Sequence, residues 1–480
     1  MKRLSKRLRL KTTLRRYLNS LIFFTGLVML PGYFSGANAQ VVQQKIPAKV
    51  RLLFLLDGSY SMLSRWENTN RITAAKYLLS KLVDSLQVNN DVEIALRAYG
   101  HQYHKSQQVC EDTKLEVPFG KNNHEAILQK IKTIKPKGTT PIAYALEQAG
   151  NDFTRDPNYR NIIIIITDGI EACDGDPCAV SLALQKKNIF LRPFVIGIGM
   201  NKVFEEQFNC LGRFYEATNI RDFKKALDET LTQSLEDATL TVELLDHKKR
   251  PVETNVNITF VNNFTSLPQF DFVHYLDRKG HPDTIRVDPV LNYDVIVNTV
   301  PPVIKKDLQL KAGRHNVIRI QCPRSPLIVN LPNSYEYGQK IQYLVKRPGT
   351  DETLAHYNVN ESYELLLGKY DIELLTLPRV YLKDVTLNPE GLKSIDIPGP
   401  GVVNVVASFR GYGSLYQLDN EGWQRWVYNL DEKQSRHTFA LQPGRYKMVF
   451  RSEQSLGSKY TQIKDFTLKT GETFNINFKY

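Results

Sequence analysis

The fold of this chain is indicated most clearly by the stretch Asn161-Ile162-Ile163-Ile164-Ile165-Ile166-Thr167-Asp168-Gly169. Its apolar run has the length of a strand and shows no alternation with polar residues. A strand that is apolar on both faces must be covered on both faces, which is typical of parallel sheets flanked by helices. The stretch therefore predicts the central strand of a layered α/β domain.

The segments around this strand alternate between apolar runs and amphipathic patterns. Ile72, Ala75 and Leu79 begin a series that recurs every three or four residues, which indicates one face of a helix. Strands separated by helix-length crossovers predict a doubly wound, mostly parallel, Rossmann-like sheet over residues 46–237. The expected strands are residues 50–56, 92–99, 161–167 and 190–198, and the expected helices are residues 72–86, 125–134, 142–153, 177–187 and 222–235.

The first 39 residues have the order of a secretory signal peptide. Eight basic residues and no acid occur there, an apolar run covers residues 21–30, and Ala37-Asn38-Ala39 offers a cleavage site before Gln40. The alternative is a membrane-anchoring helix, which needs about 20 apolar residues, and Pro31 interrupts the run well short of that. We expect a secreted, periplasmic or cell-surface protein with no transmembrane segment after cleavage.

The net charge outside the predicted signal peptide is too small to indicate a class of partner. The chain has 480 residues and a formal net charge of +13, of which eight charges lie in the predicted signal peptide. The remaining +5 gives no argument for nucleic acid as a partner. The length itself predicts more than one domain, at about 100–200 residues per domain.

Export exposes the cysteines to oxidising conditions, so disulfides are expected. The first half of the chain holds Cys110, Cys173, Cys178 and Cys210. Four cysteines allow three pairings, among which the sequence does not choose. Cys173 and Cys178 are close enough to bridge one loop, and Cys110 reaches that loop if its segment lies at the same face. Cys322 stands apart and is the expected odd thiol.

The second half of the chain carries a threefold repeat. Lys306-Asp307, Lys383-Asp384 and Lys464-Asp465 each begin a short apolar segment that is followed by a glycine and an alternating strand. Upstream of them, Tyr293, Tyr370 and Tyr446 recur at intervals of 77 and 76 residues. These markers predict three β modules, each a small sandwich, at residues 238–321, 322–398 and 399–480. The alternative is one irregular β domain with accidental similarity.

Oxygen-bearing side chains follow the first predicted strand and the isoleucine strand. Asp57, Ser59 and Ser61 occupy alternate positions after the first strand, Thr140 opens a helix, and Asp168 ends the isoleucine strand. In open α/β sheets, ligands bind at the carboxyl ends of the strands, near a topological switch point. Carboxylate and hydroxyl oxygens suit Mg²⁺, Mn²⁺ or Ca²⁺ better than zinc or copper. The five residues are therefore the candidate ligands of a divalent cation, Mg²⁺ first.

This pattern resembles the von Willebrand factor type A domain with a metal-ion-dependent adhesion site. The family pattern of aspartate-x-serine-x-serine, a distant threonine and an aspartate after an apolar strand is matched by the five residues named above. The stretch 168–178 is also similar to exported bacterial members. The resemblance favours Thr140 over Thr139 as the ligand. It implies an open metal position that a partner's carboxylate fills, which is consistent with a cation held mainly by neutral hydroxyls.

Other functions are weaker alternatives. There is no phosphate-binding loop, no HExxH motif and no Gly-x-Ser-x-Gly elbow, so a metal-dependent hydrolase would have no recognisable base or nucleophile. His101, His104 and Cys110 keep a zinc site open, although their spacing matches no zinc motif. The sequence thus predicts a non-enzymatic binding or adhesion protein whose bound cation bridges to an Asp or Glu of a protein partner.

The β modules offer a second class of function. The last module gathers Tyr412, Tyr416, Trp423, Trp426 and Tyr428. Flat aromatic faces stack on sugars, but in a β sandwich such residues are more often half-buried or paired across strands. A glycan-binding surface protein and an accessory subunit of an exported complex are therefore the alternatives.

Overall fold

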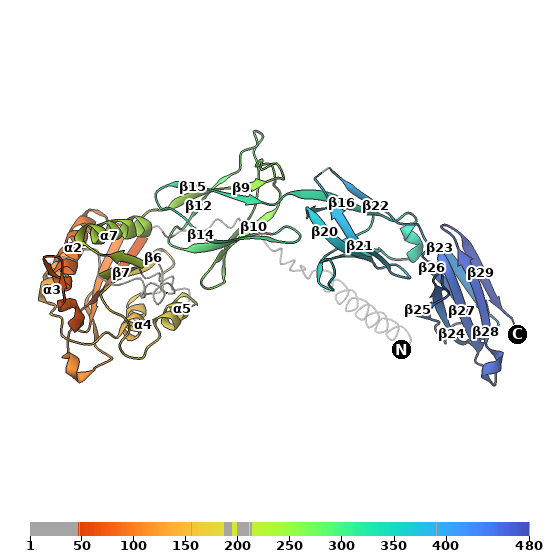
Figure 1. Ribbon diagram of the computed structural model, residues 1–480, viewed down its shortest axis with the longest axis horizontal. Helices are drawn as coiled ribbons and strands as arrows, with labels where there is room; N and C mark the ends of the chain where they lie inside the picture. The colour runs from red at the N-terminus through yellow and green to blue at the C-terminus, as the bar shows by residue number, and fades with distance from the viewer. Residues whose placement is uncertain are drawn as a thin grey trace, which may run out of the picture. The chain divides into compact units, whose positions relative to one another are not determined.

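The computed structural model of the chain describes residues 47, 49–154, 156–186, 194–198, 211, 214–389 and 391–479. The predicted signal peptide and Cys210 lie outside these residues. Within the described part, an α/β domain is followed by groups of β-strands (Figure 1). Two short strands, β2 (Arg65–Trp66) and β3 (Thr69–Asn70), pair beside the first of the helices.

The α/β domain contains one six-stranded sheet in the order β5-β4-β1-β6-β7-β8. Its strands are β1 (Lys49–Asp57), β4 (Val92–Tyr99), β5 (Thr113–Gly120), β6 (Tyr159–Thr167), β7 (Phe194–Ile198) and β8 (Phe214–Ala217). All neighbouring pairs are parallel except β4 and β5. The prediction of a doubly wound, mostly parallel sheet is confirmed.

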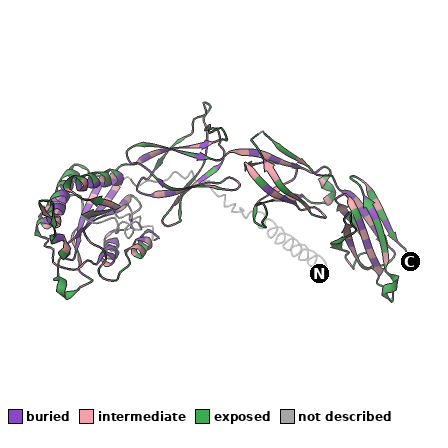
Figure 2. Ribbon diagram, viewed as in Figure 1, coloured by how far each residue is buried: buried purple, intermediate pink, exposed green. Residues whose placement is uncertain are grey.

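Helices cover both faces of this sheet, as the isoleucine strand requires. On one face Leu52, Phe54 and Leu56 pack with residues of α2 (Arg71–Ser85), α3 (His124–Thr133) and α7 (Ile220–Leu235). On the other face Leu53 and Leu55 pack with α4 (Ile142–Asp152) and α5 (Pro177–Lys186). Figure 2 shows the buried residues concentrated in the sheet between these two layers. All five isoleucines of β6 have no accessible surface.

Two strands of the sheet were not predicted, and both are marginal. Strand β5 is the antiparallel edge strand, only half-buried, and it contains Pro118. Proline is tolerated on edge strands, but it weakens the strand signal in the sequence. Strand β8 has only four residues and forms the opposite edge.

The second half of the chain repeats one seven-strand topology three times. The first group is β9 (Ala238–Leu245), β10 (Asn257–Asn262), β11 (Pro268–Val273), β12 (Thr284–Val287), β13 (Asn292–Val297), β14 (Val303–Gln309) and β15 (His315–Gln321). The second is β16 (Arg324–Asn330), β17 (Gln342–Lys346), β18 (Thr353–Asn358), β19 (Ser362–Leu366), β20 (Gly368–Leu374), β21 (Val380–Leu387) and β22 (Lys393–Asp396). The third is β23 (Gly401–Ala407), β24 (Gly411–Leu418), β25 (Gln424–Asn429), β26 (Arg436–Leu441), β27 (Gly444–Ser452), β28 (Gln462–Leu468) and β29 (Thr473–Phe478).

Each group forms the same two sheets. The third, second, fifth and sixth strands make a four-stranded sheet, and the fourth, first and seventh make a three-stranded sheet. The first and seventh strands run parallel in all three groups, and the other pairs are antiparallel. Side chains from both sheets share one core in each group, which is a sandwich arrangement. The bounds of the three modules stay a prediction.

The recurring tyrosines have one structural role. Tyr293, Tyr370 and Tyr446 are buried on the fifth strand of their groups. Each hydroxyl donates to a backbone carbonyl just upstream, of Asp288, Leu366 and Gln442 respectively. This is the geometry of a tyrosine corner, in which the buried hydroxyl is satisfied by the chain that leads into its own strand.

The residue after each tyrosine differs between the two groups with a bulge at this position and the group without one. In the first two groups it is aspartate, and the Oδ1 atoms of Asp294 and Asp371 accept the backbone N–H of Asp307 and Asp384 at 2.9 Å. Asp307 and Asp384 have φ of 51° and 54°, and the pairing register shifts beside both. In the third group the residue is Lys447, which pairs in unbroken register with Asp465. A carboxylate thus stabilises the left-handed bulge, and a lysine opposite an aspartate leaves a regular ladder.

The aromatic residues of the last module divide into a half-buried Tyr416 and more exposed tryptophans. Trp423 is 75% exposed and Trp426 is 58% exposed, so neither belongs to the core. Trp426 pairs across strands with Tyr416, and its Nε1 donates to Asn429 at 2.8 Å. The expectation of cross-strand pairing is thus confirmed for Trp426, which is exposed because β25 is an edge strand with most of its residues in solvent.

Candidate metal centre

The parallel pairing of β1 with β6 brings two aspartates to one edge of the sheet. Leu56 lies opposite Ile166, so Asp57 and Asp168 follow at the same carboxyl end. Asp57 is fully buried, and its Oδ1 accepts the backbone N–H of Ser59 at 2.7 Å. Its Oδ2 accepts the hydroxyl of Thr167 at 2.6 Å. These two bonds fix the Asp57 carboxylate in one orientation.

The two serines lie between the aspartates. The hydroxyl oxygens of Ser59 and Ser61 are 2.9 Å apart, and Ser61 donates to Oδ1 of Asp168 at 2.7 Å. The loop that carries them is held by its neighbour, since Ser59 forms an isolated parallel bridge with Gly138. The serine hydroxyls and the Asp168 carboxylate therefore form one continuous set of oxygens.

Thr140 enters the same edge from the segment before α4. A Cβ atom built on Gly169, directly after Asp168, would lie 3.8 Å from both the Thr140 and the Ser61 hydroxyl oxygens. Thr140 is buried, whereas Thr139 is only half-buried. The structure thus brings together all five residues that the sequence predicted as ligands: Asp57, Ser59, Ser61, Thr140 and Asp168.

The electrostatics of this set favour a positive ligand. Burial, followed by the negative charge of Asp168, raises the pKa of Asp57 to about 6. Hydrogen bonds from Ser59 and Thr167 only partly offset this rise. A divalent cation beside the two carboxylates would remove the repulsion between them. Because all the donors are oxygens of carboxylates and hydroxyls, the set fits Mg²⁺, Mn²⁺ or Ca²⁺.

The structure overturns the zinc alternative. Cys110 forms a disulfide with Cys173, so it has no thiolate to offer a metal. His101 Nε2 lies 2.9 Å from Glu116, and the His104 side chain caps the short turn η3 (Lys105–Gln107). Within the described ranges, no group of three or more His, Cys, Asp or Glu side chains is placed to hold a metal.

The disulfides settle part of the pairing that the sequence left open. Cys110 bonds to Cys173 rather than Cys173 bonding to Cys178. Cys178 is disulfide-bonded as well. Cys322 is free, as predicted; it is also buried, and burial raises the pKa of its thiol to about 11.

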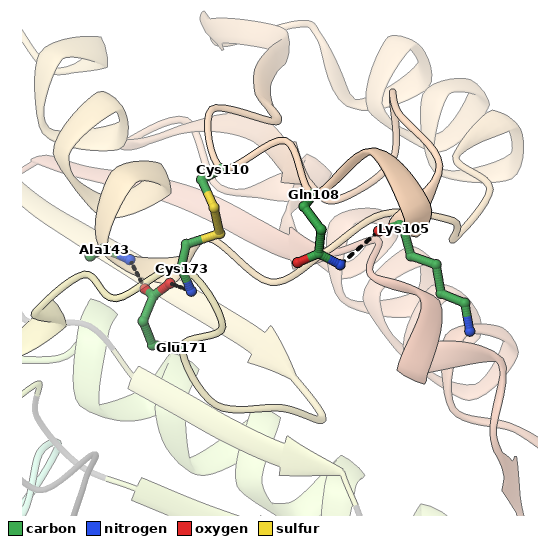
Figure 3. Close-up of a disulfide and its surroundings, with 6 residues drawn as sticks. All are labelled: Lys105, Gln108, Cys110, Ala143, Glu171 and Cys173. Atoms are coloured by element: carbon green, nitrogen blue, oxygen red, sulfur yellow. Dashed lines mark hydrogen bonds between the residues drawn. A yellow bond between two sulfur atoms is a disulfide. The ribbon is translucent and has the colours of Figure 1, made fainter.

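Glu171 and the disulfide hold the loop that follows Asp168 (Figure 3). Glu171 Oε2 accepts the backbone N–H of Ala143 in the first turn of α4 at 2.6 Å, and Oε1 accepts that of Cys173 at 2.9 Å. The backbone N–H of Ala172 donates to the backbone carbonyl of Thr140 at 3.1 Å. The sequence did not single out Glu171. No local pattern marks it, because its partner at the N-terminus of α4, where a negative charge is favourable, lies 28 residues away.

Arg71 is the second residue that the sequence missed. Its Nη1 donates to Oδ2 of Asp168 at 2.7 Å, and the Asp168 side chain is fully buried in this pair. Arg71 is the first residue of α2, which has no acid in its first turn. A cation is unfavourable at the positive end of a helix, and this misplaced charge was the available signal.

Comparison with known proteins identifies the domain. A model of the von Willebrand factor type A domain matches residues 52–171. The chain is 31% identical over 215 residues to the uncharacterized protein YwmC of Bacillus subtilis (strain 168), covering 43% of this chain and 93% of YwmC. The chain belongs to the von Willebrand factor type A domain family. Domains of this family commonly bind a divalent cation, and residues 46–237 are called the VWA domain below.

Two further proteins are similar to this chain. The chain is 26% identical over 200 residues to the thrombospondin-related anonymous protein of Plasmodium berghei (strain Anka), covering 39% of this chain and 31% of that protein. The solved pilus adhesin SpaC of Lactobacillus rhamnosus GG matches at 9% identity and a TM-score of 0.35, covering 91% of this chain and 87% of SpaC. A TM-score this low carries no argument about function. Among the described residues, no helix is long and apolar enough to cross a membrane.

Proposed function

We propose that this chain is an exported, non-enzymatic binding protein whose VWA domain uses a divalent cation to bind an acidic side chain of a protein partner. The observation that carries the proposal is the convergence of three hydroxyls and two carboxylates at the carboxyl edge of the sheet. A bound cation would supply an open coordination position for a carboxylate oxygen of the partner.

The residues of the chain have distinct parts in this proposal. Ser59, Ser61 and Thr140 offer hydroxyl oxygens, which leave most of the cation's charge available to an incoming anion. Asp168 offers the carboxylate oxygens nearest the serines. Asp57 orients the loop through the N–H of Ser59 and adds a buried negative charge. Mg²⁺ is the proposed cation, with Mn²⁺ or Ca²⁺ as the alternatives.

A binding role fits this edge better than hydrolysis. The titratable neighbours of the donor set are already engaged, since Arg71 bonds to Asp168 and Glu171 bonds to two backbone amides. His101, which follows the end of β4, is paired with Glu116. A hydrolase would need a general base within hydrogen-bonding reach of a metal-bound water. Support for export comes from the predicted signal peptide and the disulfide.

The test is a pull-down with the immobilised full chain, in Mg²⁺ and in EDTA. A partner bound through the site is released by EDTA, returns with Mg²⁺, and is not captured by D57N. It also loses affinity when its own contacting Asp or Glu is replaced by the corresponding amide. A partner that binds equally in EDTA and to D57N contradicts the metal bridge.

A second candidate function has one observation in its favour. Trp423 and Trp426 expose large aromatic faces on the edge of the last module, where they stabilise no core. We propose glycan binding there as the alternative function. A glycan array probed with the full chain and with the W426A variant tests it. Binding that W426A abolishes supports the candidate, and a blank array removes it.

A further inference from the structure

Arg71 occupies a position that helix electrostatics disfavour. It begins α2, after the N-cap Asn70, whose side chain accepts the backbone N–H of Thr73. The first turn contains no acid, so nothing within the helix offsets the charge of the guanidinium at the helix's positive end. A cation at this place must be stabilised from outside the helix.

The guanidinium is instead directed at the candidate metal centre. Nη1 bonds to Oδ2 of Asp168 at 2.7 Å, while Ser61 bonds to the other oxygen of the same carboxylate. The backbone N–H of Arg71 donates to Ser64, which ties it to the turn that follows the two serines. Its Nε is buried and has no hydrogen-bond partner among the described residues. The arginine is thus fixed beside the donor set, and its side chain remains 21% exposed.

Arg71 changes the net charge of the cation-loaded site. The carboxylates of Asp57 and Asp168 carry two negative charges, which a divalent cation balances. Without Arg71 the loaded site would be neutral, and with it the site keeps one positive charge. A second cation lies nearby, because the ammonium of Lys105 sits 3.6 Å from the ring centroid of Tyr60, between the two serines in sequence. The loaded site therefore selects an anion rather than a neutral oxygen ligand.

Resting on the proposed function, we infer that Arg71 is a specificity-determining residue of the site. One oxygen of the partner's carboxylate takes the open position on the cation, and the other oxygen accepts a hydrogen bond from the guanidinium. The planar fork of arginine matches the two oxygens of a carboxylate, whereas the ammonium of lysine offers a point charge. Before the partner arrives, the guanidinium is bonded to Oδ2 of Asp168.

The experiment uses Mn²⁺ and two peptides as probes, with D57N as the variant that tests the metal site and three further variants of the full chain. The probes are Mn²⁺ alone and the end-blocked peptides Gly-Asp-Gly and Gly-Asn-Gly, each titrated calorimetrically, the peptides into Mn²⁺-saturated protein. The three further variants are R71M, R71K and the charge-matched control K81M. Lys81 is exposed on the same helix, ten residues and about 15 Å further along its axis.

The expected result separates Mn²⁺ binding from peptide binding. R71M binds Mn²⁺ at least as tightly as the wild type, because a like charge has been removed. It binds the Asp peptide about tenfold more weakly or worse, since a charge-assisted hydrogen bond is lost. R71K shows part of that loss, because it keeps the charge and loses the fork. K81M matches the wild type with Mn²⁺ and with the Asp peptide.

Two results overturn the inference while leaving the proposed function standing. One is R71M binding the Asp peptide as tightly as the wild type. The other is R71M losing Mn²⁺ affinity, which would make Arg71 a support of the metal site and not a contact of the ligand. If the Mn²⁺-loaded wild type binds the Asp and Asn peptides equally, or if D57N binds Mn²⁺ like the wild type, the proposed function fails, and the inference fails with it.

Discussion

Replacing Asp57 by asparagine should make the protein more stable than the wild type without a cation and less stable than the wild type with one. The side chain keeps its shape but loses its charge. In the cation-free protein, burial and the charge of Asp168 raise the pKa of Asp57 from 3.8 to about 6. That difference corresponds to about 3 kcal/mol of destabilisation of the ionised form at neutral pH. D57N removes this cost.

The substitution also weakens one hydrogen bond. Asp57 accepts from Ser59 and Thr167, and an amide has only one acceptor oxygen for these two donors. The loss costs about 1–2 kcal/mol. The net expectation is a VWA domain that is about 1–2 kcal/mol more stable than the wild type in EDTA. For a domain of this size that is a rise in Tm of about 2–8 °C.

Differential scanning calorimetry in EDTA and in Mg²⁺ measures both states. The wild type should gain about 3 kcal/mol when Mg²⁺ is present at about 100 times its Kd, and D57N should gain nothing. The two proteins therefore exchange order: D57N is the more stable in EDTA and the wild type is the more stable in Mg²⁺. If Asp57 only supported the fold, its substitution would lower the Tm both in EDTA and in Mg²⁺.

The matched control is D152N. Asp152 lies at the end of α4, remote from the edge that holds the donor set, and its two oxygens accept from Nε and Nη2 of Arg97 at 2.7 and 2.8 Å. Breaking this largely buried pair should lower stability in both conditions and leave the Mg²⁺ gain intact. Two outcomes would contradict this role of Asp57: D57N being less stable than the wild type in EDTA, or D57N keeping the Mg²⁺ gain.

Three further predictions follow from the same structure. Folding raises the pKa of Asp57, so the contribution of this group to the stability of the cation-free domain is fully present below about pH 4 and is lost as the pH rises through 6. The Mg²⁺ gain measured by calorimetry should therefore be small at pH 5 and large at pH 7.5. A gain that stays constant with pH is the contrary result. E171Q leaves one of two backbone N–H groups, those of Ala143 and Cys173, with a weakened partner, and calorimetric titration should show about a tenfold loss of Mg²⁺ affinity; unchanged affinity would show that the loop is held without it. Y370F strands the carbonyl of Leu366 and should cost about 1 kcal/mol in urea unfolding of its module without altering the Mg²⁺ response, and a neutral substitution would count against the tyrosine corner.

The α/β fold was predictable because its signal is local and strong. A fully apolar β6 leaves only arrangements that cover both faces, and the helical periodicity around it supplies the covers. Strands β5 and β8 were missed because edge strands bury little surface and so leave a weak pattern. The order of strands within each β group was also beyond the sequence, since a repeat of period 77 and 76 shows that the groups are alike without showing how their strands pair.

The candidate site was predictable to the extent that its residues follow strand ends. Asp57 and Asp168 end neighbouring parallel strands, and parallel pairing alone brings them together. Arg71 and Glu171 were missed because their partners are distant in sequence, 97 positions for Arg71 with Asp168 and 28 for Glu171 with Ala143. Only the three-dimensional arrangement shows which charge meets which. A charge that conflicts with its own helix remains the one local clue to Arg71.

Anomalous diffraction of Mn²⁺ in crystals of the protein would show directly where the cation binds. We expect a peak at the carboxyl edge of the sheet, contacted by the hydroxyl oxygens of Ser59, Ser61 and Thr140, beside the Asp168 carboxylate. It also predicts that D57N crystals grown in the same Mn²⁺ lack the peak. A wild-type map with no peak at this edge, or with Mn²⁺ bound elsewhere in the VWA domain, would contradict the account.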